Sequence, residues 1–185
     1  KTIGTYGLMN EGIISTRLGL PGKPILAEEI QVARDIKLTR YAESKLHFTG
    51  VTSPKSLEYI NRSKETGIAV TCSVTPAHLY FSDEDLQTYD TNLKLYPPLR
   101  ATTERDALKA AVLNGSVDCI ASHHQPHEYD SKVCEFEYAK AGMIGLETSY
   151  GVMGAVFGEM LSAEKWVELI SINPRRVLGL EMPVI

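Results

Sequence analysis

Three short apolar runs, separated by helical patterns, constrain the fold of this chain more than any other feature. The runs cover residues 46–51, 68–75 and 117–122, and the second is rich in β-branched residues. Short runs of this kind are typical of buried strands. Strands that alternate with helices indicate an α/β fold with a parallel sheet. Because three strands are too few to close an eight-stranded barrel, the chain is either a small open sheet or part of a barrel.

The segments around these runs divide into a turn-rich start and a series of helices. Residues 1–23 contain several glycines and read as loop. Apolar residues recur at helical spacing over residues 24–43. Near the end of the chain we expect helices over residues 148–160 and 163–172, and a short one after Asn173. No internal repeat or low-complexity linker divides the chain, so residues 1–185 are treated as one domain.

Two helix starts carry capping signals. Ser53 followed by Pro54 predicts an N-cap with proline at the first helical position. Thr103 with Asp106 three residues later predicts a capping box. The helix that begins there is expected to run to Gly115. The acidic residues of the SDED stretch at 82–85 are most simply a solvated turn or helix start.

Composition excludes several classes of protein. A net charge of −4 gives no basic footprint for nucleic acid or anionic lipid, and no apolar run approaches the roughly 18 residues of a membrane span. The cysteines Cys72, Cys119 and Cys134 are few, odd in number and widely spaced, which favours reduced thiols. We therefore expect a cytoplasmic protein that binds neither nucleic acid nor membrane.

Histidines follow two of the apolar runs, where ligands meet parallel α/β folds. His123, His124 and His127 lie within five residues. Neutral imidazoles are common metal ligands, so His123 and His124 are candidate ligands, and His127 could converge with His123. The alternative is a polar loop whose histidines bond to backbone groups. His78 reads more simply as a loop residue with backbone partners, and His47 as a core or opposite-face histidine.

A series of motifs resembles the dihydroorotase family, and more narrowly its bacterial class related to allantoinase and hydantoinase. In order they are MNEG, RLGLPGKP, AEE with VARDI, VTCSVTPAHL, KLYPPLR with ERDAL, VDCIASHHQPH and GMIGLET. The resemblance covers essentially the whole chain. No nucleophile elbow, phosphate loop or dinucleotide fingerprint competes with it.

The resemblance implies a metal-dependent hydrolase barrel of the TIM (β/α)8 type. On that plan, residues 1–185 form a partial barrel domain, a fragment of a longer chain, and supply about strands six to eight. The family interconverts carbamoyl-aspartate and dihydroorotate in pyrimidine biosynthesis. It uses zinc, and the remaining ligands would lie upstream of Lys1.

The departures from the family pattern concern the active site. Gly50 stands where the family has a metal-binding histidine, and His123 stands where it has the catalytic, zinc-binding aspartate. Tyr96 replaces a substrate-contacting asparagine, and Ala77 replaces the first histidine of TPHHL. His127 keeps a family substrate-binding position. If the chain is catalytic, His123 is the candidate for the aspartate's role.

These departures predict a catalytically degenerate homologue, a pseudoenzyme, in which zinc is absent or altered. The resemblance implies a structural or regulatory role beside aspartate carbamoyltransferase. Two alternatives stay open: an active zinc-dependent cyclic amidohydrolase with rearranged ligands, and a small-molecule binding module. Unpaired sheet edges also lead us to expect a homo-oligomer, unless the sheet is completed by further chain.

Overall fold

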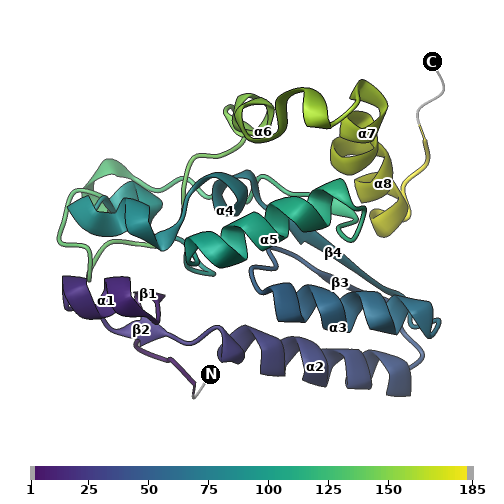
Figure 1. Cartoon of the computed structure of the whole chain (residues 1–185), viewed down its shortest axis with the longest axis horizontal. Helices are drawn as coiled ribbons and strands as arrows, with labels where there is room; N and C mark the ends of the chain where they lie inside the picture. The colour runs from purple at the N-terminus through teal and green to yellow at the C-terminus, as the bar shows by residue number, and fades with distance from the viewer. Residues whose placement is uncertain (1–2, 183–185) are drawn as a thin grey trace.

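A three-stranded parallel sheet lies at the centre of the computed structural model, which describes residues 3–182 (Figure 1). Its strands are β3 (Leu46–Phe48), β4 (Val70–Val74) and β5 (Cys119–Ile120), in the order β3-β4-β5. Both pairings are parallel. The predicted α/β fold is confirmed, and all three strands fall inside the predicted runs.

The two faces of the sheet differ because successive side chains of a strand point to opposite sides. Val70, Cys72 and Val74 of β4 are buried in the main apolar core. Thr71 and Ser73 alternate with them and carry hydroxyls to the other face. The sheet therefore has an apolar face that packs under helices and a polar face that leads toward the strand ends.

Three helices cover the apolar face: α2 (Leu26–Tyr41), α3 (Pro54–Glu65) and α5 (Thr102–Leu113). In Figure 1, α2 and α3 run side by side beneath α5. Their apolar side chains recur at helical spacing and meet the strands in one cluster. The buried members from these helices are Val32, Ile36, Leu57, Ile60, Leu108, Ala111 and Val112.

The capping predictions had different outcomes. The hydroxyl of Ser53 accepts from the backbone N–H groups of Lys55 and Ser56, so this N-cap is confirmed. The capping box at Thr103 is wrong, because α5 already begins at Thr102 with Ala101 as its N-cap. Thr103 thus lies inside the first turn, where its hydroxyl donates to the adjacent Glu104 instead of capping.

The turn-rich start of the chain is more ordered than its sequence indicates. It forms β1 (Met9–Asn10), α1 (Ile13–Leu18) and β2 (Gly22–Lys23), with β1 and β2 paired in parallel. The loop prediction is therefore wrong in part for residues 3–23, and its first two residues lie outside the described range. The physical reason is tertiary, because Met9 is fully buried in a second apolar cluster with distant residues such as Leu99.

The predicted C-terminal helices are present as α6 (Ser149–Phe157), α7 (Ala163–Val167) and α8 (Asn173–Leu178). In Figure 1, α7 and α8 lie together at one end of the molecule, and α6 lies above α4 (Pro76–Tyr80). The remaining elements are η1 (Asp83–Thr88), η2 (Thr91–Leu93), η3 (Tyr129–Ser131), η4 (Gly158–Met160) and η5 (Glu168–Ile172). Within residues 3–182 the sheet does not close into a barrel. No helix of this described range is long and apolar enough to cross a bilayer.

Candidate site at the carboxyl ends of the strands

The carboxyl ends of the three central strands meet in one place, which we call the mouth. It consists of residues 49–50 after β3, 75–78 after β4 and 122–127 after β5. The hydroxyl oxygen of Thr49 lies 2.7 Å from Nε2 of His123, so the loop after β5 reaches the end of β3. The arrangement follows from the parallel sheet, because all three strands end at the same edge.

His123 is half-buried in the mouth and lies against Gly50. A Cβ atom built on Gly50 would come within 2.3 Å of Cε1 of His123. Burial lowers the pKa of the His123 imidazole, because a charged ring loses hydration there. The two positions at which the sequence departs most from the dihydroorotase pattern are therefore in direct contact.

His78 is buried and both of its ring nitrogens are engaged. Nε2 donates to the carbonyl oxygen of Pro97 at 2.9 Å, and Nδ1 lies 2.7 Å from the hydroxyl of Thr75. Burial lowers the pKa of His78 to about 4, so the ring is neutral near pH 7. The expectation of backbone partners is confirmed for Nε2, although His78 lies in α4 and not in a loop.

The other two histidines of the loop contact separate backbone segments. Nδ1 of His124 accepts from the N–H groups of Gly145 and Leu146, each at 3.3 Å. Nε2 of His127 donates to the carbonyl oxygen of Ala141 at 2.9 Å. These bonds hold the segment around 141–146 against the loop. The substrate role predicted for His127 stays a prediction.

The space enclosed at the mouth is small. Its volume is about 20 Å³, lined by side chains that include His78, His123 and Met143. A cavity of this size holds about one water molecule. Tyr96 also lines it, with 68% of the residue exposed and the ammonium nitrogen of Lys23 4.2 Å from the ring centroid. The substrate contact predicted for Tyr96 stays a prediction.

The mouth residues of this chain do not by themselves supply a complete set of zinc ligands. Zinc sites in proteins use three or four nitrogen, sulfur or carboxylate ligands. Gly50 and Ala77 have no ligand atom, and both nitrogens of His78 are occupied by hydrogen bonds. Across the described residues, no three His, Cys, Asp or Glu side chains gather as a metal site would require. The metal-ligand roles predicted for His123 and His124 stay predictions.

A line of polar side chains runs along the polar face of the sheet to the mouth. Nδ1 of His47 lies 2.8 Å from the Thr71 hydroxyl, and its Nε2 lies 3.2 Å from the Ser73 hydroxyl. Ser73 in turn donates to Thr49 at 3.2 Å, and Thr49 contacts His123. The opposite-face interpretation of His47 agrees with this placement. Burial lowers the pKa of the His47 imidazole.

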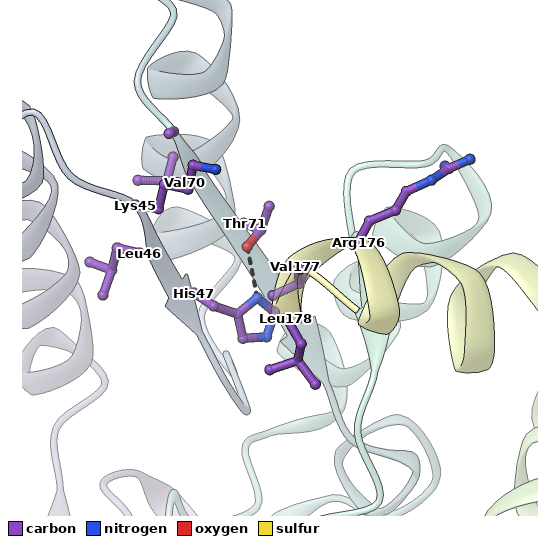
Figure 2. Close-up of a pocket in the computed structure, with 10 residues that line it drawn as sticks. Lys45, Leu46, His47, Val70, Thr71, Arg176, Val177 and Leu178 are labelled. Atoms are coloured by element: carbon purple, nitrogen blue, oxygen red, sulfur yellow. Dashed lines mark hydrogen bonds between the residues drawn. The ribbon is translucent and has the colours of Figure 1, made fainter. Parts of the chain in front are cut away.

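A larger hollow of about 480 Å³ lies at the opposite end of the strands (Figure 2). It opens between the amino ends of β3 and β4 and helix α8, with His47 and Leu178 on facing sides. Ligand sites of parallel α/β folds lie at the carboxyl ends of strands, so position alone does not favour this hollow as the functional site.

A buried polar network beside the mouth was missed by reasoning from the sequence. Arg100 is 4% exposed and donates from Nε to the Thr52 hydroxyl and from Nη1 to the side-chain oxygen of Asn10. Its Nη2 lies 3.8 Å from a carboxylate oxygen of Glu28. The backbone N–H groups of Thr52 and Ser53 donate to the same carboxylate. The sequence did contain a signal for this network, because Asn10, Glu28 and Arg100 lie in the motifs MNEG, AEE and PPLR, respectively.

Asp83 extends this network and corrects one expectation. It is only 3% exposed, and its carboxylate accepts from the side-chain amide of Asn10 at 2.8 Å. Burial raises the pKa of Asp83. The acidic run at 82–85 does start a helix, but its first carboxylate is buried and not solvated, because β1 packs against it.

Comparison with known proteins finds that the sequence is similar to dihydroorotases. No family model matches the chain. It is 41% identical over 182 residues to a dihydroorotase of Caldanaerobacter subterraneus subsp. tengcongensis, and 39% identical over 177 residues to one of Deinococcus radiodurans. These matches cover 97% and 96% of the chain but only 42% of each relative. The chain thus spans less than half the length of these relatives.

Solved structures agree in fold. An L-hydantoinase (dihydropyrimidinase) from Arthrobacter aurescens matches with a TM-score of 0.80 at 27% identity, over 86% of the chain and 36% of that protein. A D-hydantoinase from Thermus sp. matches with a TM-score of 0.79 at 17% identity, over 86% of the chain and 37% of that protein. The fold is therefore that of part of an amidohydrolase barrel.

Proposed function

Since the chain is similar to dihydroorotases over almost its whole length, we propose that it is the later part of a dihydroorotase-like protein that has lost zinc-dependent catalysis. The scaffold would serve a structural or regulatory role beside aspartate carbamoyltransferase, the preceding enzyme of pyrimidine synthesis. The family reaction is the interconversion of carbamoyl-aspartate and dihydroorotate.

One observation carries this proposal: the part of the mouth that this chain supplies lacks side chains that the family's chemistry uses, while the strands and helices that carry it are formed. Gly50 stands at a family ligand position without a ligand atom, Ala77 replaces the first histidine of the family's TPHHL segment, and His123 stands at the aspartate position. A bound zinc supplies Lewis-acid polarisation and an activated water. A neutral imidazole cannot supply a carboxylate's negative charge, so His123 does not reproduce the charge that the aspartate provides.

The buried polar network supports the retained scaffold. Arg100, Asn10 and Glu28 remain paired although the mouth has changed. A chain under no constraint to fold would lose such partners, because a buried charge without its partner strongly destabilises the folded state. The network therefore supports a stably folded scaffold around the mouth.

The test is to express the full-length protein and to measure its zinc content and its cyclisation of carbamoyl-aspartate. A dihydroorotase such as that of Deinococcus radiodurans, prepared in parallel, is the matched control. We expect substoichiometric zinc and turnover at least about 10³-fold below the control, because both the metal and the general base are affected. Stoichiometric zinc with turnover like the control would contradict the proposal and support rearranged ligands.

The proposed regulatory role is tested by measuring whether this protein binds aspartate carbamoyltransferase. We expect the full-length protein to co-elute with aspartate carbamoyltransferase in size-exclusion chromatography and to change the activity of that enzyme. Binding of a small molecule from a panel, with neither turnover nor association, would instead favour the binding-module alternative.

A further inference from the structure

We propose that the His123 imidazole is a plug that fills the side-chain space of residue 50, so that Gly50 and His123 form one interdependent pair. This proposal rests on the proposed loss of catalysis and extends it to the contact between these two residues. The packing of the plug, however, can be tested without any assay of the family reaction. The proposal thus explains the replacements at residues 50 and 123 together, although they are far apart in the sequence.

The space around Gly50 shows that these two residues exclude each other's side chains. The three atoms nearest to a Cβ at this position all belong to the His123 ring: Cε1 at 2.3 Å, Nδ1 at 3.1 Å and Nε2 at 3.2 Å. A separation below 3.0 Å is not tolerated without movement. The imidazole is therefore where a side chain of residue 50 would begin, and any larger residue at 50 must displace it.

Two further features indicate that the ring is held in place. The Thr49 hydroxyl lies 2.7 Å from Nε2, beside the glycine that makes room for the ring. His123 itself has φ of +46°, a left-handed conformation that is unusual for a residue with a Cβ. Such a conformation is maintained only where the surrounding contacts stabilise it. The Thr49 contact and the space over Gly50 supply that stabilisation.

The consequence for the mouth is that neither substitution alone can restore both family ligand positions. A histidine introduced at Gly50 would meet the His123 ring, and an aspartate introduced at His123 would leave Gly50 without a ligand atom. The imidazole and the glycine thus share one site at the strand ends, beside the cavity of about 20 Å³ that His123 also lines.

A double-mutant cycle in the full chain tests the plug. Gly50→Ala is compared with Gly67→Ala, since both glycines have positive φ, +68° and +81°, but a Cβ on Gly67 meets nothing within 4 Å. Gly67→Ala should lower the Tm by about 2–4 °C through backbone strain alone. Gly50→Ala should lower it by at least about twice as much, because it adds the clash with the ring.

The decisive comparison repeats Gly50→Ala in a His123→Ala background. We expect the Tm loss caused by Gly50→Ala to fall there to about that of Gly67→Ala, because the obstructing ring is gone. If Gly50→Ala does not fold, recovery of circular dichroism and cooperative melting in the double variant is the corresponding result. An undiminished Tm loss, or continued failure to fold, would overturn the plug while leaving the zinc and turnover tests unaffected.

Discussion

At the scale of single residues, burial lowers the pKa of three histidines in or beside the mouth. His78 has its two nitrogens bonded to Pro97 and Thr75, and burial holds its pKa at about 4 against an ordinary value of 6.5. His123 and His47 are half-buried, and their pKa values are lowered for the same reason. All three rings therefore favour the neutral form, in which each hydrogen bond is kept.

This gives a pH dependence of stability. Because the folded pKa of His78 lies below its unfolded value, the unfolded state binds more protons between pH 6.5 and 4. The contribution is present above pH 6.5 and is lost as pH falls through this window. We expect a loss of about 2 kcal/mol from His78 between pH 7 and pH 5, measured by urea unfolding.

The variant His78→Gln should weaken this dependence, since it removes the titrating ring and keeps an amide that can donate to Pro97. The unsubstituted protein, unfolded over the same pH range, is the reference. An unchanged slope in His78→Gln would show that another group governs the acid sensitivity.

At the scale of elements, the start of α3 joins the helix to its neighbour α2. The hydroxyl of Ser53 accepts from the backbone of α3 and donates to the carboxylate of Glu29 in α2 at 2.7 Å. Ser53 is fully buried. One side chain therefore caps one helix and satisfies a carboxylate of another, which fixes how the two helices pack.

We expect Ser53→Ala to lower the free energy of unfolding by roughly 2–3 kcal/mol, combining a lost cap with a lost charged hydrogen bond. Ser162→Ala, which removes the exposed cap of α7, is the control and should cost about 1 kcal/mol. Urea unfolding of both variants makes the comparison. Equal losses would mean that the bond to Glu29 contributes nothing.

At the scale of the whole molecule, Arg100 connects parts of the chain that are distant in sequence. It bonds to Asn10 in β1, to the carbonyl oxygen of Lys23 in β2 and to Thr52 after β3. Glu28 provides its opposite charge. The N-terminal sheet is therefore attached to the central sheet through one buried guanidinium.

We expect Arg100→Met to destabilise the protein by about 3–5 kcal/mol, because it leaves Glu28 without its buried partner. Amide exchange over residues 9–23 should accelerate, as measured by mass spectrometry. Arg105→Met, which breaks a pair with the exposed Asp106, is the control and should cost less than about 1 kcal/mol. Unchanged exchange over residues 9–23 would contradict the linking role.

By itself, the sequence determined the features that depend on neighbouring residues. The alternation of strands and helices, the cap at Ser53 and the dihydroorotase motifs could all be predicted, because helical and strand periodicity and capping involve residues a few positions apart. The replacements at Gly50 and His123 were also visible from the motifs.

Only the tertiary structure decided what those replacements do together. Thr49 and His123 are 74 positions apart, and Asn10 and Asp83 are 73 apart, so no local pattern could bring either pair into contact. The same holds for β1 and β2, which read as loop because their order comes from burial of Met9 beneath distant residues. Periodicity fixes which face of an element is buried, whereas the contact between two faces depends on how the whole chain packs.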